Sequence, residues 1–105
     1  MLTMNEIAIR CKKVLKDHYG EQFGGLILHG SHARDQAKLS SDIDLLVLLN
    51  KPFNYFEELR RVIDMLYPIQ LESAQLISAK PAAVDEFKDG SLQLYRNARS
   101  EGLAL

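Results

Sequence analysis

The sequence predicts an α/β domain with the element order α-β-α-β-α-β-α, in which helices pack against a mixed three-stranded sheet. Two observations predict this class. Short aliphatic runs of strand length alternate with segments whose apolar residues recur every three or four positions. Residues typical of turns and helix ends separate these segments. The 105 residues are enough for one modest hydrophobic core, so we expect a single domain over residues 1–105.

The first helix is expected over residues 3–19. Thr3 and Glu6 have the spacing of a capping box, and Gly20 suits the end of the helix. Cys11 lies on the apolar stripe of this helix, so we expect it in the core rather than as a nucleophile.

The first two strands are expected at about residues 25–29 and 42–49. Residues 45–49 are apolar on both faces, which is typical of a central strand that is covered on both sides. A helix over about 54–66 follows, and Pro68 is expected to end it.

The third strand is expected from Ile69 to Ile77. Two further helices are predicted around residues 82–88 and 91–100, because their apolar residues again have helical spacing. A turn at residues 89–91 separates them.

Two aspartates, Asp42 and Asp44, open the second strand. Residues two apart in a strand point to the same face, so both carboxylates are expected side by side. The two carboxylates repel each other unless a cation binds between them or one of them takes up a proton. Mg²⁺ is the usual cation for carboxylates that face a phosphate. The alternatives are a turn role for Asp42 and a structural salt bridge for Asp44, whose aliphatic surroundings make an unpaired carboxylate costly.

The pattern Gly30-Ser31, ten residues and then Asp42-x-Asp44 resembles the signature of the DNA polymerase β-type nucleotidyltransferase superfamily. The resemblance implies the nucleotidyltransferase fold and transfer of a nucleoside monophosphate from a triphosphate. It also implies two Mg²⁺ ions at Asp42 and Asp44, one on the triphosphate and one on the acceptor hydroxyl.

The strings at residues 30–34 and 41–47 resemble the small stand-alone branch called minimal nucleotidyltransferases, or MNT domains. One departure is Asp35, where this branch commonly has glycine. Members of the branch are about as long as this chain and often act as antitoxins of HEPN-domain toxins. The resemblance therefore implies ATP as substrate and a HEPN partner, with a tyrosine of that partner as the expected AMP acceptor.

The segment after the first strand is expected to contact nucleotide phosphates. Gly30 lets the backbone approach a ligand closely, and residues 31–36 are expected to form a short helix whose first amides and Ser31 hydroxyl face the phosphates. His32 is a candidate ligand contact, with a structural role as its alternative. Arg34 is expected either to touch a phosphate or to pair with an acid.

Superfamily members usually carry a third carboxylate on the third strand. Gln70, Glu72 and Ala74 would share one face of that strand, and Glu72 is the acid among them. Glu72 is therefore a candidate metal ligand or base. The alternative is an exposed ion pair.

Composition limits the function classes. Apolar residues make up 47% and charged residues 26%, as in ordinary globular proteins. The net charge of −1 gives no electrostatic case for DNA binding, which counts against a polymerase. A lone cysteine fits a reducing cytoplasm, and neither a membrane span nor a signal-peptide pattern is visible.

A binding module that neutralises its partner by covering it is the rival to an enzyme. An aminoglycoside or tRNA nucleotidyltransferase is a weaker alternative, since those enzymes resemble the core only and need additional domains. The acceptor, the nucleotide and the oligomeric state, homo- or hetero-oligomer, stay open at this point.

Overall fold

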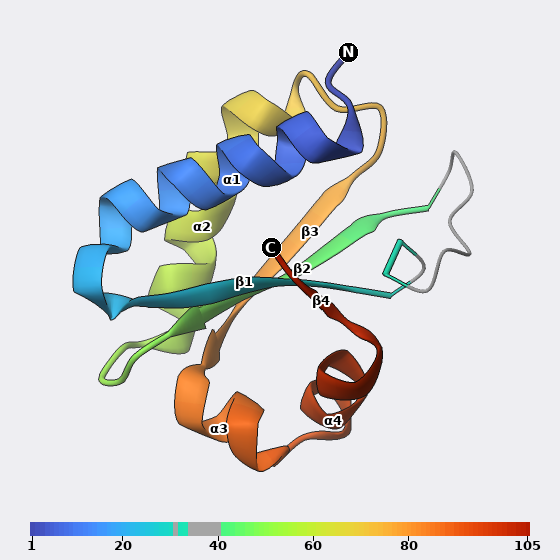
Figure 1. Cartoon of the computed structure of the whole chain (residues 1–105). Helices are drawn as coiled ribbons and strands as arrows, with labels where there is room; N and C mark the ends of the chain where they lie inside the picture. Colours follow the sequence, from blue (N-terminus) through green and yellow to red (C-terminus); the bar gives the residue numbers. More distant parts are fainter. Residues whose placement is uncertain (31, 34–40) are drawn as a thin grey trace.

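A mixed four-stranded sheet forms the centre of the protein in the computed structural model, which describes residues 1–30, 32–33 and 41–105 (Figure 1). The elements in chain order are α1 (Met4–Tyr19), the 3-10 turn η1 (Gly20–Gln22), β1 (Phe23–His29), β2 (Ile43–Leu49), α2 (Tyr55–Gln70), β3 (Ile77–Ala83), α3 (Val84–Asp89), α4 (Gln93–Glu101) and β4 (Leu103–Ala104).

The strand order is β3-β2-β1-β4. β2 runs antiparallel to β1 and parallel to β3, so it is the central strand that its apolar residues predicted. β4 adds a short antiparallel pair to β1, with Leu28 opposite Leu103. The mixed sheet and the helices confirm the predicted fold class, with one strand more than expected.

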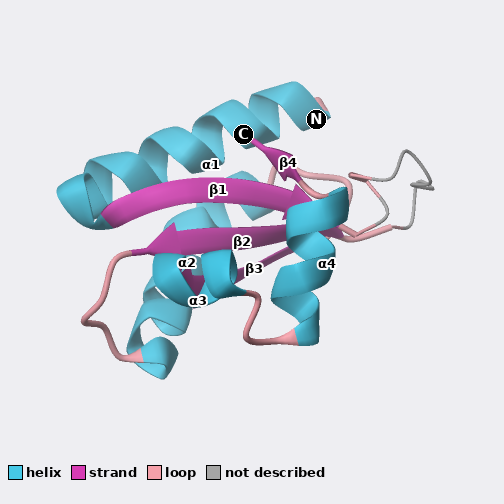
Figure 2. Cartoon of the chain, turned by 60° about the horizontal axis from the view of Figure 1, so that its bottom comes forward, coloured by secondary structure: helices cyan, strands magenta, loops and turns pink. Residues whose placement is uncertain are grey.

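Helices cover both faces of the sheet (Figure 2). Alternate residues of β2 separate two hydrophobic clusters, because side chains in a strand alternate between faces. On one face Leu45 and Val47 pack with α1 and α2. On the other face Leu46 and Leu48 pack with α3 and α4. We call these the α1/α2 face and the α3/α4 face.

The third strand was predicted in the wrong place. Residues 69 and 70 belong to α2, which continues through Pro68, and β3 starts at Ile77. Pro68 removes one helical hydrogen bond, but it lies in the last turn, where the helix is about to end. Burial of Ile69, which is 5% exposed, stabilises that turn.

β3 contains Pro81, which lies between the strand expected to end at Ile77 and the helix expected around residues 82–88. Proline is tolerated in an edge strand, because its missing N–H can face away from the neighbouring strand. β3 is an edge of the described sheet, so Pro81 is compatible with pairing to β2.

A buried polar cluster joins α1 to α2. The Tyr19 hydroxyl donates to Glu58 Oε1 at 3.0 Å, and Arg61 donates to the other carboxylate oxygen. Glu58 is only 6% exposed, so these two bonds offset the cost of burying its charge.

In the described part of the chain, no helix has both the length and the apolar character that crossing a bilayer requires.

Candidate active site

The acid pair lies at the start of β2. Ile43, between the two aspartates, is 1% exposed in the α1/α2 cluster, and its N–H donates to the Leu76 carbonyl at 2.8 Å. Because Ile43 is fixed on that face, strand alternation turns Asp44, and Asp42 just before the strand, toward the α3/α4 face. Asp42 is exposed and Asp44 is partly buried.

Gly30 lies directly against Asp44. A Cβ atom built on Gly30 would be 2.4 Å from Asp44 Oδ2, and the backbone there has φ +74°. The dihedral angle therefore favours glycine, and a larger residue would also have to displace the Asp44 carboxylate. The glycine was predicted to allow close approach of a ligand, and the structure shows that the group already close to it is the Asp44 carboxylate.

His29 is the cross-strand neighbour of Asp44 in the β1–β2 register. Burial lowers the pKa of His29, while the Asp44 carboxylate raises it and Lys80 lowers it. The net direction is downward, so the imidazole is neutral at neutral pH, with one nitrogen able to accept a hydrogen bond.

β3 contributes the other side of the site. Ser78 is opposite Asp44 and Lys80 is opposite Leu46 in the parallel register. Ala82 packs in the α3/α4 cluster, so Ser78 and Lys80, two and four residues before it, also belong to that face. The sequence analysis missed both residues, because they lie after the expected third strand and before the next expected helix. The alternation of polar and small residues at 78–82 is only a weak strand signal, because residues 77–83 contain few β-branched or aromatic side chains.

Glu72 does not lie on the strand beside β2. It is in the turn after α2, where its carboxylate accepts from Arg10 at 2.9 Å, and the two side chains are 54% and 49% exposed. The placement that made Glu72 the third acid is therefore wrong, and the exposed ion pair describes its contacts. β3 itself, with the sequence ISAKPAA, contains no acid.

A model of the nucleotidyltransferase domain family matches residues 9–90, which is more than half of the chain. The chain belongs to the nucleotidyltransferase domain family. No curated protein sequence matches it at a significant level. The matched segment includes β1, β2 and β3, so the acid pair, Gly30 and the β3 residues all lie within it. Family membership supports nucleotidyl transfer as the reaction class.

Part of the predicted nucleotide site of this nucleotidyltransferase lies outside the described residues. This is the case for Ser31, for Arg34 and for most of the short helix expected over 31–36. His32 is described in a turn, and its Nε2 atom is buried without a hydrogen-bond partner among the described residues. A ligand atom near Nε2 would satisfy that nitrogen.

The donor set fits one divalent ion. Mg²⁺ is commonly bound by one or two carboxylates together with substrate phosphates, and Asp42 and Asp44 supply two carboxylates. Within residues 1–30, 32–33 and 41–105, no group of three His, Cys, Asp or Glu residues could hold a metal ion. The described residues therefore offer no third carboxylate for the second ion that the resemblance implies.

Proposed function

We propose that this nucleotidyltransferase moves AMP from ATP to a hydroxyl of a partner protein with Mg²⁺ bound at Asp42 and Asp44. We also propose that it is the cytoplasmic antitoxin of a HEPN/MNT toxin–antitoxin pair. The observation that carries the first proposal is the position of Asp44, on one face with Asp42 and against Gly30, in a chain of this family. The HEPN partner follows from the resemblance to MNT domains.

The reaction is an in-line displacement. The acceptor hydroxyl oxygen forms a bond to the α-phosphorus, the bond from that phosphorus to the bridging oxygen breaks, and pyrophosphate leaves with the electron pair. The hydroxyl proton passes to solvent. Mg²⁺, when bound, neutralises phosphate charge. Asp42 and Asp44 would hold that ion beside the phosphates, and Gly30 leaves room for the Asp44 carboxylate. Positioning and charge neutralisation supply most of the acceleration.

The test is transfer of label from α-labelled ATP to the partner protein. The partner is sought as the product of the neighbouring reading frame, a small helical protein with an Arg-x4-His motif. We expect labelling with the wild type and loss of labelling with Asp44→Asn. Asp64→Asn is the matched control, because Asp64 is exposed on α2, away from the acid pair. Absence of labelling by the wild type on its true partner contradicts the proposed transfer.

The second candidate function is a non-catalytic antitoxin or nucleotide-binding module. The absence of an acid from β3 favours it, because one ion can hold a nucleotide without activating an acceptor. Neutralisation of the toxin in cells separates the two functions. An enzyme requires Asp44 and ATP for neutralisation, whereas a covering module neutralises equally well with Asp44→Asn.

A further inference from the structure

A lysine occupies the strand on which a third carboxylate was expected. Lys80 is exposed on β3, on the same face of the sheet as Asp44. Adjacent strands are about 4.8 Å apart and two residues span about 6.6 Å, so the Lys80 and Asp44 Cα atoms are roughly 8 Å apart along the diagonal. Long side chains reach across such a diagonal.

The charge of Lys80 acts on His29, which pairs with Asp44 across the strands. His29, the cross-strand neighbour of Asp44, has its pKa lowered mainly by burial, and the positive charge of Lys80 adds to that lowering. The Asp44 carboxylate acts on the same imidazole in the opposite direction. Lys80 on β3 and Asp44 on β2 are thus both electrostatic neighbours of His29.

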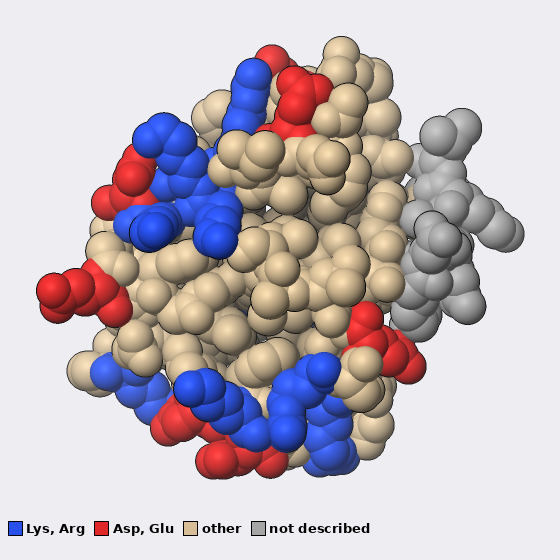
Figure 3. Space-filling view, in the orientation of Figure 1, with Lys and Arg blue, Asp and Glu red and all other residues tan. Residues whose placement is uncertain are grey.

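Lys80 has no carboxylate partner within the described part of the chain, unlike Lys13 and Lys51. Lys13 pairs with Asp17 at 3.1 Å, and Lys51 pairs with Glu86 at 2.8 Å. On the face seen in Figure 3, the basic side chains gather over α1 and around α3 and α4, and acidic side chains lie among them in both regions. The Lys80 ammonium is therefore free to bind an anionic ligand.

The ligand class follows from the site. A triphosphate brings several negative charges to a place that already has two carboxylates, and one divalent ion neutralises only part of that charge. Lysine binds phosphate as a point charge with three donors and tolerates variable geometry. A lysine at this position adds positive charge where a third carboxylate would add negative charge.

We propose that Lys80 Nζ binds phosphate oxygens of the nucleoside triphosphate and takes over charge neutralisation that a third carboxylate and its metal ion would otherwise provide. This inference rests on the proposed function, in which the site binds a nucleoside triphosphate. It holds for an enzyme and for a nucleotide-binding module, because both must hold the phosphates.

The test is calorimetric titration of ATP and of inorganic tripolyphosphate, each with Mg²⁺, into the wild type and variants. Lys80→Ala is expected to weaken both ligands by about tenfold or more, since a hydrogen bond to a charged group contributes about 1.5–3 kcal/mol. Lys80→Arg is expected to keep most of the affinity. Lys80 is exposed, so the melting temperature without ligand should not change.

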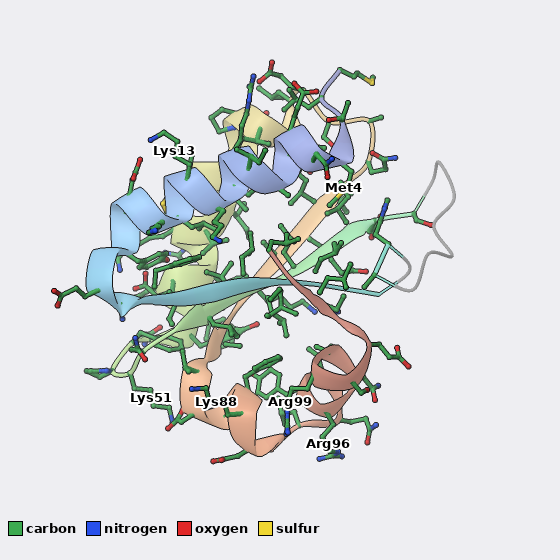
Figure 4. All side chains as sticks on the ribbon, in the orientation of Figure 1. Met4, Lys13, Lys51, Lys88, Arg96 and Arg99 are labelled. Atoms are coloured by element: carbon green, nitrogen blue, oxygen red, sulfur yellow. The ribbon has the colours of Figure 1, made fainter. Side chains whose placement is uncertain are left out.

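Lys13→Ala is the matched control. It removes the same charge from a side chain that is 75% exposed on α1, which covers the opposite face of the sheet (Figure 4). Equal weakening by Lys13→Ala would mean a general charge effect and would overturn the contact. So would a loss for ATP without a loss for tripolyphosphate, because the phosphates would then not be the group bound.

The two proposals fail separately. If the wild type binds Mg²⁺-ATP, Asp44→Asn abolishes binding and Lys80→Ala binds as the wild type does, the Lys80 inference is wrong and the proposed function stands. If the wild type binds neither ATP nor tripolyphosphate, the proposed function is contradicted, and the role of Lys80 with it.

Discussion

The Asp44 carboxylate fills the space that a side chain at Gly30 would need. The closest approach, 2.4 Å from a built Cβ to Asp44 Oδ2, joins the end of β1 to the start of β2 at the site of the acid pair. A methyl group there must displace the carboxylate, because strand pairing holds the backbone of His29 opposite that of Asp44. The absence of a side chain at Gly30 thus leaves the space that the carboxylate of the second aspartate occupies.

Gly30→Ala is therefore expected to abolish Mg²⁺-dependent nucleotide binding. The methyl group pushes the Asp44 carboxylate away from the Asp42 carboxylate, with which it is proposed to bind the ion. The left-handed backbone conformation adds about 1–2 kcal/mol of strain. Nucleotide titration and chemical denaturation of the same variant measure the two effects.

Gly20→Ala provides the control for strain. Gly20 also has a positive φ, +57°, but a Cβ there meets no atom within 4 Å. A loss of stability with unchanged nucleotide binding is expected. If Gly20→Ala and Gly30→Ala reduce binding equally, strain rather than displacement of Asp44 explains the loss.

Mg²⁺ with ATP is expected to raise the melting temperature of the wild type much more than that of Asp42→Asn/Asp44→Asn. A ligand at ten times its Kd stabilises the native state by about 1.4 kcal/mol, which corresponds to roughly 5–10 °C for a chain of this length. Thermal melts with and without ligand measure the shift. Equal shifts in both proteins would remove the acid pair from the site.

The same double variant without ligand is expected to be no less stable than the wild type. Replacing two neighbouring carboxylates with amides removes their mutual repulsion. A large loss of stability without ligand would instead support the alternative in which Asp44 forms a structural salt bridge.

The buried Cys11 thiol is expected to lower the stability of the protein at alkaline pH. Burial raises the pKa of the Cys11 thiol from 9.0 to about 11. Below pH 9 the thiol is protonated in both states, so it has no effect. Between pH 9 and 11 the unfolded state loses the proton first, and the free energy of unfolding falls by up to about 2.7 kcal/mol.

Denaturation of the wild type and Cys11→Ala at pH 8, 9 and 10 measures this contribution. The wild type should lose stability more steeply than the variant, because tyrosines and lysines titrate in both proteins and cancel. Parallel pH profiles would show that the thiol ionises equally easily in the folded protein.

The acid pair could be placed from the sequence because its surroundings are unambiguous. A continuous apolar run defines β2, and alternation then fixes the face of Asp44 whatever the neighbouring strands do. The sequence predicted a close approach at Gly30 but not that Asp44 makes it. That contact depends on how β1 and β2 pair, which the periodicity of apolar residues does not show.

β3 could not be placed in the same way. Its sequence, ISAKPAA, is poor in the β-branched and aromatic residues that favour strands. Its extended state comes from pairing with β2, from Ile77 to Ala83, which is tertiary context. The residues before it read as a strand, but Gln70 ends α2 and accepts the Ile77 N–H at 2.6 Å, which ties the helix to the start of β3.

The correction of β3 changes the expectation for Glu72. A third acid on the strand would make Glu72→Gln lose transfer by on the order of 10²–10⁴. In the turn after α2, with Arg10 as its partner and about half of each side chain exposed, Glu72 is expected to matter little. Transfer should stay within about twofold of the wild type, and stability within about 1 kcal/mol, as is usual for a surface ion pair.

Transfer rates for Glu72→Gln and Arg10→Ala, together with denaturation of both variants, test whether Glu72 takes part in transfer. The two variants break the same ion pair from opposite sides, so equal and small effects are expected from both. A rate loss of 10² or more that is confined to Glu72→Gln, with unchanged stability, would show that this carboxylate reaches the reacting atoms. That result would require residues 71–76 to rearrange when nucleotide and acceptor bind, since the described structure holds Glu72 against Arg10.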